Sequence, residues 1–596
     1  MTRHRLPAIG LACLTATTGG PSAAFADIRD ADDQPTPAQC AALGFRAAPE
    51  AGYGRPVGMM RKPAPSYAPA PPPPPPPPPA MASPPPSIPP LPVPPVAHRV
   101  APAGALQEMV VSGSRITPGY PGPARDTERY PGAVANPIRQ TASEPVSTFS
   151  VDVDTASYAN VRRFISEGAR VPADAVRVEE MVNYFDYGYA GPTDRAQPFS
   201  TYVALAPSPW SAQRQILHIG IQGYDLTRAE PPPLNLVFLI DTSGSMSGPD
   251  RLPLAQKSLS LLIGQLRPQD RVSMVAYAGS AGAVLGPTSG REKLKLRCAL
   301  TALHAGGSTA GGQGLELAYG LARERFDPKA VNRVILVTDG DFNVGIADPS
   351  RLKDFVSEKR KDGVYLSVYG FGRGNYNDTM MQALAQNGNG TAAYVDSLQE
   401  ARKLFREDFT RSLFPIADDV KIQVEFNPAQ VSEYRLIGYE TRMLAREDFN
   451  NDQVDAGEVG AGASVTALYE ITPAGATPSA DPLRYGGAAA KPGPSGELAY
   501  LKVRYKLPGG KVSKLIERPV TRADARPSLA AAPEPTRWAV AVAGFGQKLK
   551  QDPRVSDAFG WDQVIALAQT ARGPDPFGER AEFVQLVRGV SSAGDK

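Results

Sequence analysis

The pattern of apolar and polar positions changes along the folded part of the chain. From about residue 146, "STFSVDVDTASYANVRRFI" predicts a strand followed by an amphipathic helix, and residues 202–205 and 216–221 read as further strands. From Leu234, uninterrupted apolar runs alternate with segments of helical periodicity. Alternation with a period of two returns after about residue 416, and helical spacing follows Pro535. The pattern therefore predicts three folded regions of different character.

The middle region has the pattern of an α/β domain. The run "LNLVFLI" lacks alternation, as expected for a strand that is covered on both faces. Further strands are predicted in "RVSMVAYAG", "NRVILVTDG" and "VYLSVYGFG", and helices in "LAQKSLSLLIGQL", "GLELAYGLARERF" and "MMQALAQNG". Repeated strand and helix units predict a doubly wound, mainly parallel sheet, in which ligands bind beyond the carboxyl ends of the strands.

The last third of the chain predicts an antiparallel β-sandwich followed by helices. Its strands are expected in "VKIQVEFNP", "VSEYRLIGYE", "SVTALYEITP" and "AYLKVRYKLP". We expect the strands that precede Leu234 to join the same sandwich, so that both flanks of the α/β region form one composite domain.

The N-terminal region has the composition of an exported, unfolded segment. Residues 1–26 resemble a signal peptide, with basic residues, a modest apolar stretch and Ala24-Phe25-Ala26 before the expected cleavage point. Residues 27–135 are too rich in proline for a core and predict a disordered or polyproline spacer. The alternative for residues 1–26 is a disordered cytoplasmic tail. We therefore expect a periplasmic, outer-membrane or cell-surface protein of a Gram-negative bacterium, with lipid attachment at Cys13 left open.

The overall composition narrows the function classes. The 596 residues contain 63 basic and 60 acidic side chains, so that the charge gives no indication of a nucleic-acid partner. Apart from the apolar stretch within residues 1–26, no part of the sequence approaches the apolar length of a membrane-spanning helix. Two well-separated cysteines, Cys40 and Cys298, do not suggest a disulfide framework. The prediction is a buried Cys298 and a free or intermolecular thiol at Cys40.

Hard oxygen donors are predicted to meet at the carboxyl edge of the parallel sheet. Asp241 follows the first strand of the α/β region and is followed by Ser243 and Ser245 in "DTSGS". Asp339 ends the strand "VILVT" in the same way, and Thr309 lies in the loop "AGGSTAGGQG" before a helix. Carboxylates and hydroxyls suit Mg²⁺, Ca²⁺ or Mn²⁺ better than zinc or copper.

These five residues in this order resemble the metal-ion-dependent adhesion site of a von Willebrand factor type A (VWA) domain. The resemblance implies that Ser243 and Ser245 bind the cation directly and that Thr309 binds it directly or through water. It implies that Asp241 and Asp339 act through water and by holding the hydroxyls. The implied cation is Mg²⁺, with Ca²⁺ or Mn²⁺ as alternatives, and the implied partner is a protein that presents an Asp or Glu.

Longer segments resemble the bacterial YfbK-type family. They include "RVEEMVNYFDY" and "GFGRGNYNDTMMQALAQNGNGTAAYVDSLQEARKLF". The family places a VWA domain between dedicated flanking regions. The expected division is a signal peptide at 1–26, a linker at 27–135, an N-terminal region at 136–230, the VWA domain at 231–415 and a C-terminal domain at 416–596.

Two other chemistries are weighed against cation-dependent binding. A metal-assisted hydrolase would need a base, and His304 near the threonine loop is the candidate, although no motif places a carboxylate beside it. Asp448, Asn450 and Asp452 have the spacing of a calcium loop, but Gln453 and Val459 stand where the glycine and glutamate are needed. A solvated acidic turn is favoured there.

Overall fold

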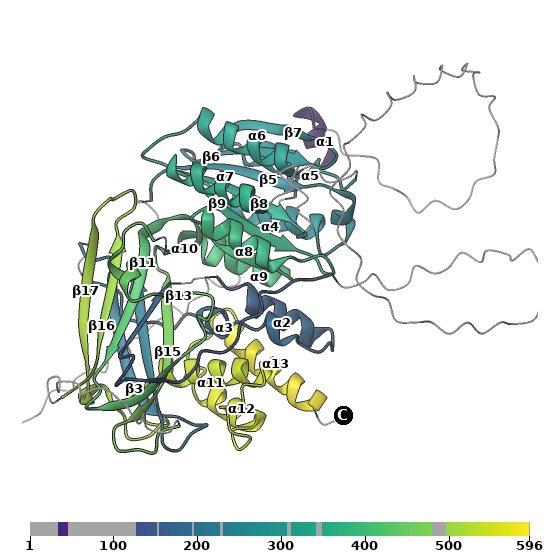
Figure 1. The fold of residues 1–596 in the computed structure, drawn as a ribbon. Helices are drawn as coiled ribbons and strands as arrows, with labels where there is room; N and C mark the ends of the chain where they lie inside the picture. Colours follow the sequence, from purple (N-terminus) through teal and green to yellow (C-terminus); the bar gives the residue numbers. More distant parts are fainter. Residues whose placement is uncertain are drawn as a thin grey trace, which may run out of the picture. The chain divides into compact units, whose positions relative to one another are not determined.

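The computed structural model describes residues 34–45, 127–151, 154–193, 196–226, 231–306, 311–340, 349–454, 456–479 and 496–594 (Figure 1). The predicted signal peptide, Cys13, most of the proline-rich segment and Thr309 lie outside these ranges.

A doubly wound sheet forms the middle of the chain, as predicted. Its six strands have the order β10-β9-β8-β5-β6-β7. All neighbouring pairs are parallel except the edge strand β7, which is antiparallel to β6. The strands are β5 (Leu234–Asp241), β6 (Arg271–Tyr277), β7 (Ala281–Ser289), β8 (Val331–Thr338), β9 (Val364–Phe371) and β10 (Ala392–Val395).

Helices cover both faces of this sheet because side chains alternate along buried strands. Leu236, Phe238 and Ile240 pack in one core with helices α4 (Leu252–Gln265), α5 (Lys293–Thr301) and α9 (Leu398–Arg402). Val237 and Leu239 pack in another with α6 (Gly311–Glu324), α7 (Pro349–Lys361) and α8 (Asp378–Asn387). The absence of alternation in "LNLVFLI" reflects this burial on two sides.

Two antiparallel sheets form the predicted composite sandwich. One has the order β1-β12-β15-β4-β3, and the other contains β13-β2-β11-β16-β17, with β14 paired to β11. Strands from before the α/β region are central to both, since β2 pairs with β11 and β4 pairs with β15. The strands are β1 (Arg139–Gln140), β2 (Val146–Ser150), β3 (Phe199–Pro207), β4 (Gln215–Gly223), β11 (Pro415–Phe426), β12 (Val431–Ile437), β13 (Met443–Leu444), β14 (Gly457–Gly460), β15 (Ser464–Pro473), β16 (Glu497–Lys506) and β17 (Ser513–Thr521).

A separate helical core packs beside the first of these sheets. It contains the large buried residues of α3 (Val178–Asn183), α11 (Glu534–Leu549), α12 (Trp561–Thr570) and α13 (Glu579–Gly594), with Tyr158 from α2 (Ala156–Ser166). Trp538 is fully buried at its centre against Phe185 and Phe583. No helix within the described ranges is long and apolar enough to cross a membrane.

Cys298 is buried, as predicted, but the prediction of a free or intermolecular thiol at Cys40 was wrong. Cys40 lies in a short helix, α1 (Pro37–Ala42), and forms a disulfide with Cys298 of α5. Thr36 and Gln39 form a capping box that starts α1. Phe45 packs against the core that contains Leu236 and Ile240. The local composition conceals this contact because the partner lies 258 residues away in the sequence. The predicted linker therefore contains an ordered, covalently attached segment.

The end of the predicted linker was also placed too late. Thr127 donates its backbone N–H to Gly374 O at 2.9 Å, and Arg129 bridges to Asn377. The Glu128 carboxylate pairs with Arg163 of α2 at 2.7 Å. These residues belong to the folded body, because their backbone groups and charges are satisfied by the α/β region and by α2.

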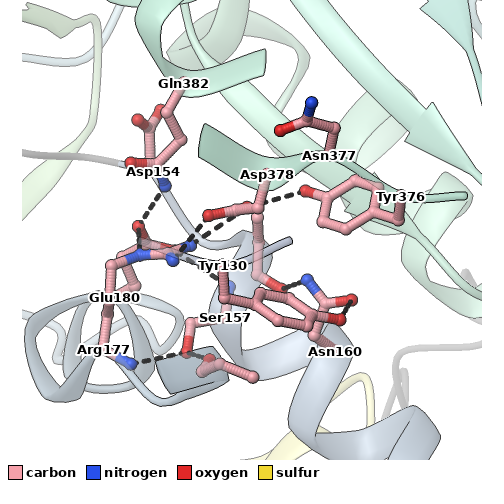
Figure 2. Close-up of polar contacts among 12 residues, drawn as sticks. Tyr130, Asp154, Ser157, Asn160, Arg177, Glu180, Tyr376, Asn377, Asp378 and Gln382 are labelled. Atoms are coloured by element: carbon pink, nitrogen blue, oxygen red, sulfur yellow. Dashed lines mark hydrogen bonds and ion pairs between the residues drawn. The ribbon is translucent and has the colours of Figure 1, made fainter. Parts of the chain in front are cut away.

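Buried ion pairs join the N-terminal flank to the α/β region (Figure 2). Arg177, which is 2 % exposed, donates to Asp378 Oδ2 at 2.6 Å and to Oδ1 at 3.2 Å. It also binds Glu180, which accepts from Gln382 Nε2 at 2.6 Å. The Tyr376 hydroxyl donates to Asp378 at 2.8 Å. This network holds the segment between β9 and α8, which lies at the carboxyl edge of the sheet.

Candidate metal centre

Asp241 is the buried centre of the candidate site. It is the last residue of β5 and is 0 % exposed. The backbone N–H of Ser243 donates to Asp241 Oδ1 at 2.9 Å. The hydroxyls of Tyr277, at the end of β6, and Thr338, at the end of β8, each donate to Oδ2 at 3.2 Å. Three neighbouring strand ends therefore fix this carboxylate.

The two serine hydroxyls lie side by side in the turn that follows. Ser243 precedes a 3-10 turn, Gly244–Ser247, and Ser243 Oγ is 2.9 Å from Ser245 Oγ. Adjacent ligands of an octahedral Mg²⁺ ion, each bound at about 2.0–2.1 Å, are themselves about 2.9 Å apart. The spacing of the two hydroxyls thus fits adjacent positions of an octahedral site.

Asp339 approaches the same region from the end of β8 and is 1 % exposed. Arg251, just before α4, has its Nη1 3.7 Å from Asp339 Oδ2. The Arg251 guanidinium also donates to the carbonyl oxygens of Ser245 and Arg373. It therefore links the serine turn to the segment that follows β9.

The residue that follows Asp339 must be glycine. Gly340 has a φ of +99°, and a Cβ there would lie 2.7 Å from Asn375 O. The chain thus leaves Asp339 in close contact with the segment after β9, where no larger residue fits.

The electrostatics of the site favour a cation. The pKa of Asp241 is raised to about 6, mainly by burial and in part by the negative charge of Asp339, while hydrogen bonds from Ser243 act in the opposite direction. Two buried carboxylates at one sheet edge disfavour each other's ionisation. A divalent cation would offset this repulsion, and the donors present, carboxylate and hydroxyl oxygens, are those that Mg²⁺ and Ca²⁺ prefer. The described residues therefore fit such an ion.

The structure brings four of the five predicted residues to one edge: Asp241, Ser243, Ser245 and Asp339. Thr309 lies outside the described residues, but the loop that leads to it reaches the site, since Gly306 N donates to Thr242 O at 2.8 Å. Thr338, Tyr277 and Arg251 were not among the predicted site residues. Thr338 and Tyr277 carried a signal, because each is a hydroxyl-bearing residue at the end of a predicted buried strand. Arg251 carried none.

The structure describes two of the histidines, His218 and His304. His218 is 0 % exposed in β4, within hydrogen-bond distance of Tyr189 OH at 2.6 Å and Thr536 Oγ1 at 3.0 Å. Burial lowers the pKa of His218 to about 3. His304 is exposed and lies beyond the end of α5.

The calcium-loop residues form an exposed, ion-paired turn. Asp452 accepts from Arg504 Nη2 at 3.0 Å and from the Ser513 hydroxyl, and Asp448 accepts from Ala445 N at 3.3 Å. Within the part of the chain that the structure describes, no group of three or more histidine, cysteine or acidic residues is arranged to hold a metal.

Family models match three consecutive parts of the chain. Residues 124–218 match "von Willebrand factor", residues 235–407 match the "von Willebrand factor type A domain", and residues 411–593 match "Uncharacterized protein YfbK, C-terminal". The second match covers the doubly wound sheet, and the third covers the C-terminal strands and helices.

Individual relatives agree with these matches. The chain is 47 % identical over 469 residues to "Uncharacterized protein YfbK" of Escherichia coli, which covers 77 % of this chain and 80 % of the relative. It is 31 % identical to "Uncharacterized protein sll0103" of Synechocystis over 30 % of this chain and 41 % of that protein. A solved structure, "von Willebrand factor type A from Catenulispora acidiphila", is 16 % identical with a TM-score of 0.39, covering 68 % of this chain and 91 % of that one. The extensive identity to the Escherichia coli protein decides the family, and the chain belongs to the YfbK family of von Willebrand factor type A proteins.

Proposed function

We propose that this protein is an exported module that binds a partner protein through a divalent cation. The cation, Mg²⁺ in preference to Ca²⁺ or Mn²⁺, is held by Ser243 and Ser245, with Thr309 as a third hydroxyl. Asp241 and Asp339 orient these groups and supply negative charge. The observation that carries the proposal is the pair of hydroxyls 2.9 Å apart beside two buried carboxylates.

The arrangement favours binding over turnover. The direct donors are neutral hydroxyls, so that a bound cation keeps much of its charge and can accept a carboxylate from another protein. Asp241 is held by donors from three strand ends and therefore needs little rearrangement when a ligand binds. A partner that presents an Asp or Glu fits this chemistry, in adhesion or in the assembly of an envelope complex.

Export to the periplasm or the cell surface is part of the same proposal. The signal-peptide pattern of residues 1–26 supports it. The disulfide between Cys40 and Cys298 supports it independently, because disulfides form and persist in oxidising compartments and are rare in the cytosol. Peripheral or lipid-anchored attachment to the envelope is compatible with both observations.

The test combines cation binding with peptide selection. Displayed random peptides are captured on the full chain in Mg²⁺ and released with a chelator. We expect the released peptides to depend on one Asp or Glu, and its replacement by Asn or Gln to abolish binding. Ser243→Ala should capture none, whereas Ser247→Ala is the matched control, since its hydroxyl donates only to Gly244 O within the turn.

A hydrolase would give a different outcome. Cation-dependent cleavage of generic esters or phosphate esters that Ser243→Ala abolishes would support metal-assisted hydrolysis instead. Peptide capture that is equal in Mg²⁺ and chelator, or that survives Ser243→Ala, would refute the proposal that the cation bridges the partner.

A further inference from the structure

A polar cavity lies at the end of the parallel sheet that is opposite to the candidate metal centre. It has a volume of about 310 Å³ and opens between the α/β region and the sandwich. Its wall includes Arg333, near the start of β8, the α8–β10 loop, and residues of β2 and β14. Ligand pockets in proteins commonly have volumes of about 300–1,000 Å³. This cavity therefore suits a small molecule.

Arg333 is the unusual residue of this wall. Its side chain is 3 % exposed, and its Nη1 donates to Ser367 Oγ at 2.6 Å. The guanidinium lies 5.4 Å from the ring centre of Tyr365. Its Nε has no hydrogen-bond partner among the described residues, and within those residues the side chain forms no ion pair. A buried cation without a paired anion is costly.

The other two arginines of the wall are already paired. Arg442 binds Asp154 Oδ2 at 3.2 Å, and Arg411 binds Asp408 at 3.1 Å and also Asp186. Burial lowers the pKa of Arg333, whereas the charge of Glu458 only partly opposes this effect. Arg333 is therefore the arginine of this wall that forms no ion pair within the described residues.

We propose that this cavity is a binding site for a small oxyanion, a molecule with a carboxylate or phosphate group that pairs with Arg333. The planar guanidinium fork can bind either group through two parallel hydrogen bonds. Such a ligand would contact the start of β8 and the sandwich strands at the same time. The proposal is independent of the metal centre.

The experiment is calorimetric titration of the full-length, metal-free protein with inorganic phosphate and, separately, with succinate, at constant ionic strength. Wild-type protein should bind one equivalent of at least one of these anions in a saturable manner. Arg333→Met should weaken this binding by about tenfold or more, as expected for loss of a charged hydrogen bond. Arg325→Met, which removes an exposed arginine beyond α6, should bind as wild type does.

Each outcome decides the proposal. Preference for phosphate or for succinate identifies the headgroup class. Absence of saturable binding of either anion to the wild type, or equal binding by Arg333→Met, would overturn it. Should Arg333→Met fail to fold, Arg333→Lys keeps the charge but loses the fork, and we expect weaker binding there too. Ser243→Ala should bind both anions normally, which separates this site from the cation site.

Discussion

Cys40 and Cys298 are joined by a disulfide across 258 residues, with their Cα atoms 5.1 Å apart. The bond attaches α1 to α5 of the doubly wound region. Thr127 and Arg129 are attached to the segment after β9 of the same region. Described residues on both sides of the proline-rich segment are thus attached to the same doubly wound region.

Reduction of this disulfide should release α1. A six-residue helix is far below the length of about 12–15 residues at which isolated helices become marginally stable. We expect hydrogen exchange across residues 37–45 to become fast after reduction, while β5 and β8 remain protected. Mass-spectrometric exchange with and without reductant measures this, and Cys40→Ser should reproduce the reduced pattern. Continued protection of α1 after reduction would show that its packing alone holds it.

Arg177→Met should destabilise the folded body by about 3–5 kcal/mol, because it leaves Glu180 and Asp378 as buried carboxylates without their counter-charge. Arg170→Met is the matched control, since Arg170 is exposed. The measurement is equilibrium unfolding in urea, monitored by tryptophan fluorescence. A loss below about 1 kcal/mol would mean that the carboxylates are protonated or hydrated and that the network contributes little.

Strands were predicted correctly where their hydrophobic pattern reflects their burial. "LNLVFLI" was predicted as a strand covered on both faces and "VILVT" as a further strand, and both lie at the centre of the sheet. The edge strand β7 was missed because "AGAVLGPTS" contains glycine and proline and is partly exposed, so that it lacks a strand pattern. The composite sandwich was expected, and β2 and β4 of the N-terminal flank pair with β11 and β15 of the C-terminal region.

At the candidate site the sequence predicted positions on strand ends but not the contacts between them. Asp241 and Asp339 could be placed together because parallel strands end at one edge. The hydrogen bond from Tyr277 to Asp241 and the contacts of Arg251 depend on how distant elements pack, which no local pattern records. The Cys40–Cys298 disulfide and the burial of Arg333 also depend on how distant elements pack.

His218 should make stability depend on pH. Its pKa is about 3 in the folded state because of burial, against about 6.5 when unfolded. The unfolded chain therefore binds more protons between these values, and the contribution of His218 is fully present above about pH 6.5 and is lost as the pH falls toward 3. The free energy of unfolding is therefore expected to fall by about 2 kcal/mol between pH 7.5 and pH 5.

His218→Gln is the comparison for this effect. Glutamine can keep hydrogen bonds to Tyr189 and Thr536 but does not titrate. Between pH 7.5 and pH 5, the unfolding free energy of the variant should fall by about 2 kcal/mol less than that of the wild type. Parallel pH profiles of wild type and variant would mean that His218 titrates normally in the folded protein.

Removal of the cation should abolish partner binding without unfolding the protein. The candidate donors lie on loops at the edge of a sheet whose core is complete without them, since β5 and β8 are buried along their whole lengths. We expect chelation to lower the unfolding free energy by no more than about 3 kcal/mol, the linkage term for a ligand at roughly a hundred times its dissociation constant. Ser245→Ala and Ser243→Ala should each remove the Mg²⁺-dependent part of this stability and leave the chelated state unchanged. Calorimetry of the three proteins in Mg²⁺ and in chelator provides the measurement. A collapse of the melting transition on chelation would instead make the cation a structural part of the fold, because folding would then depend on the binding free energy of the ion.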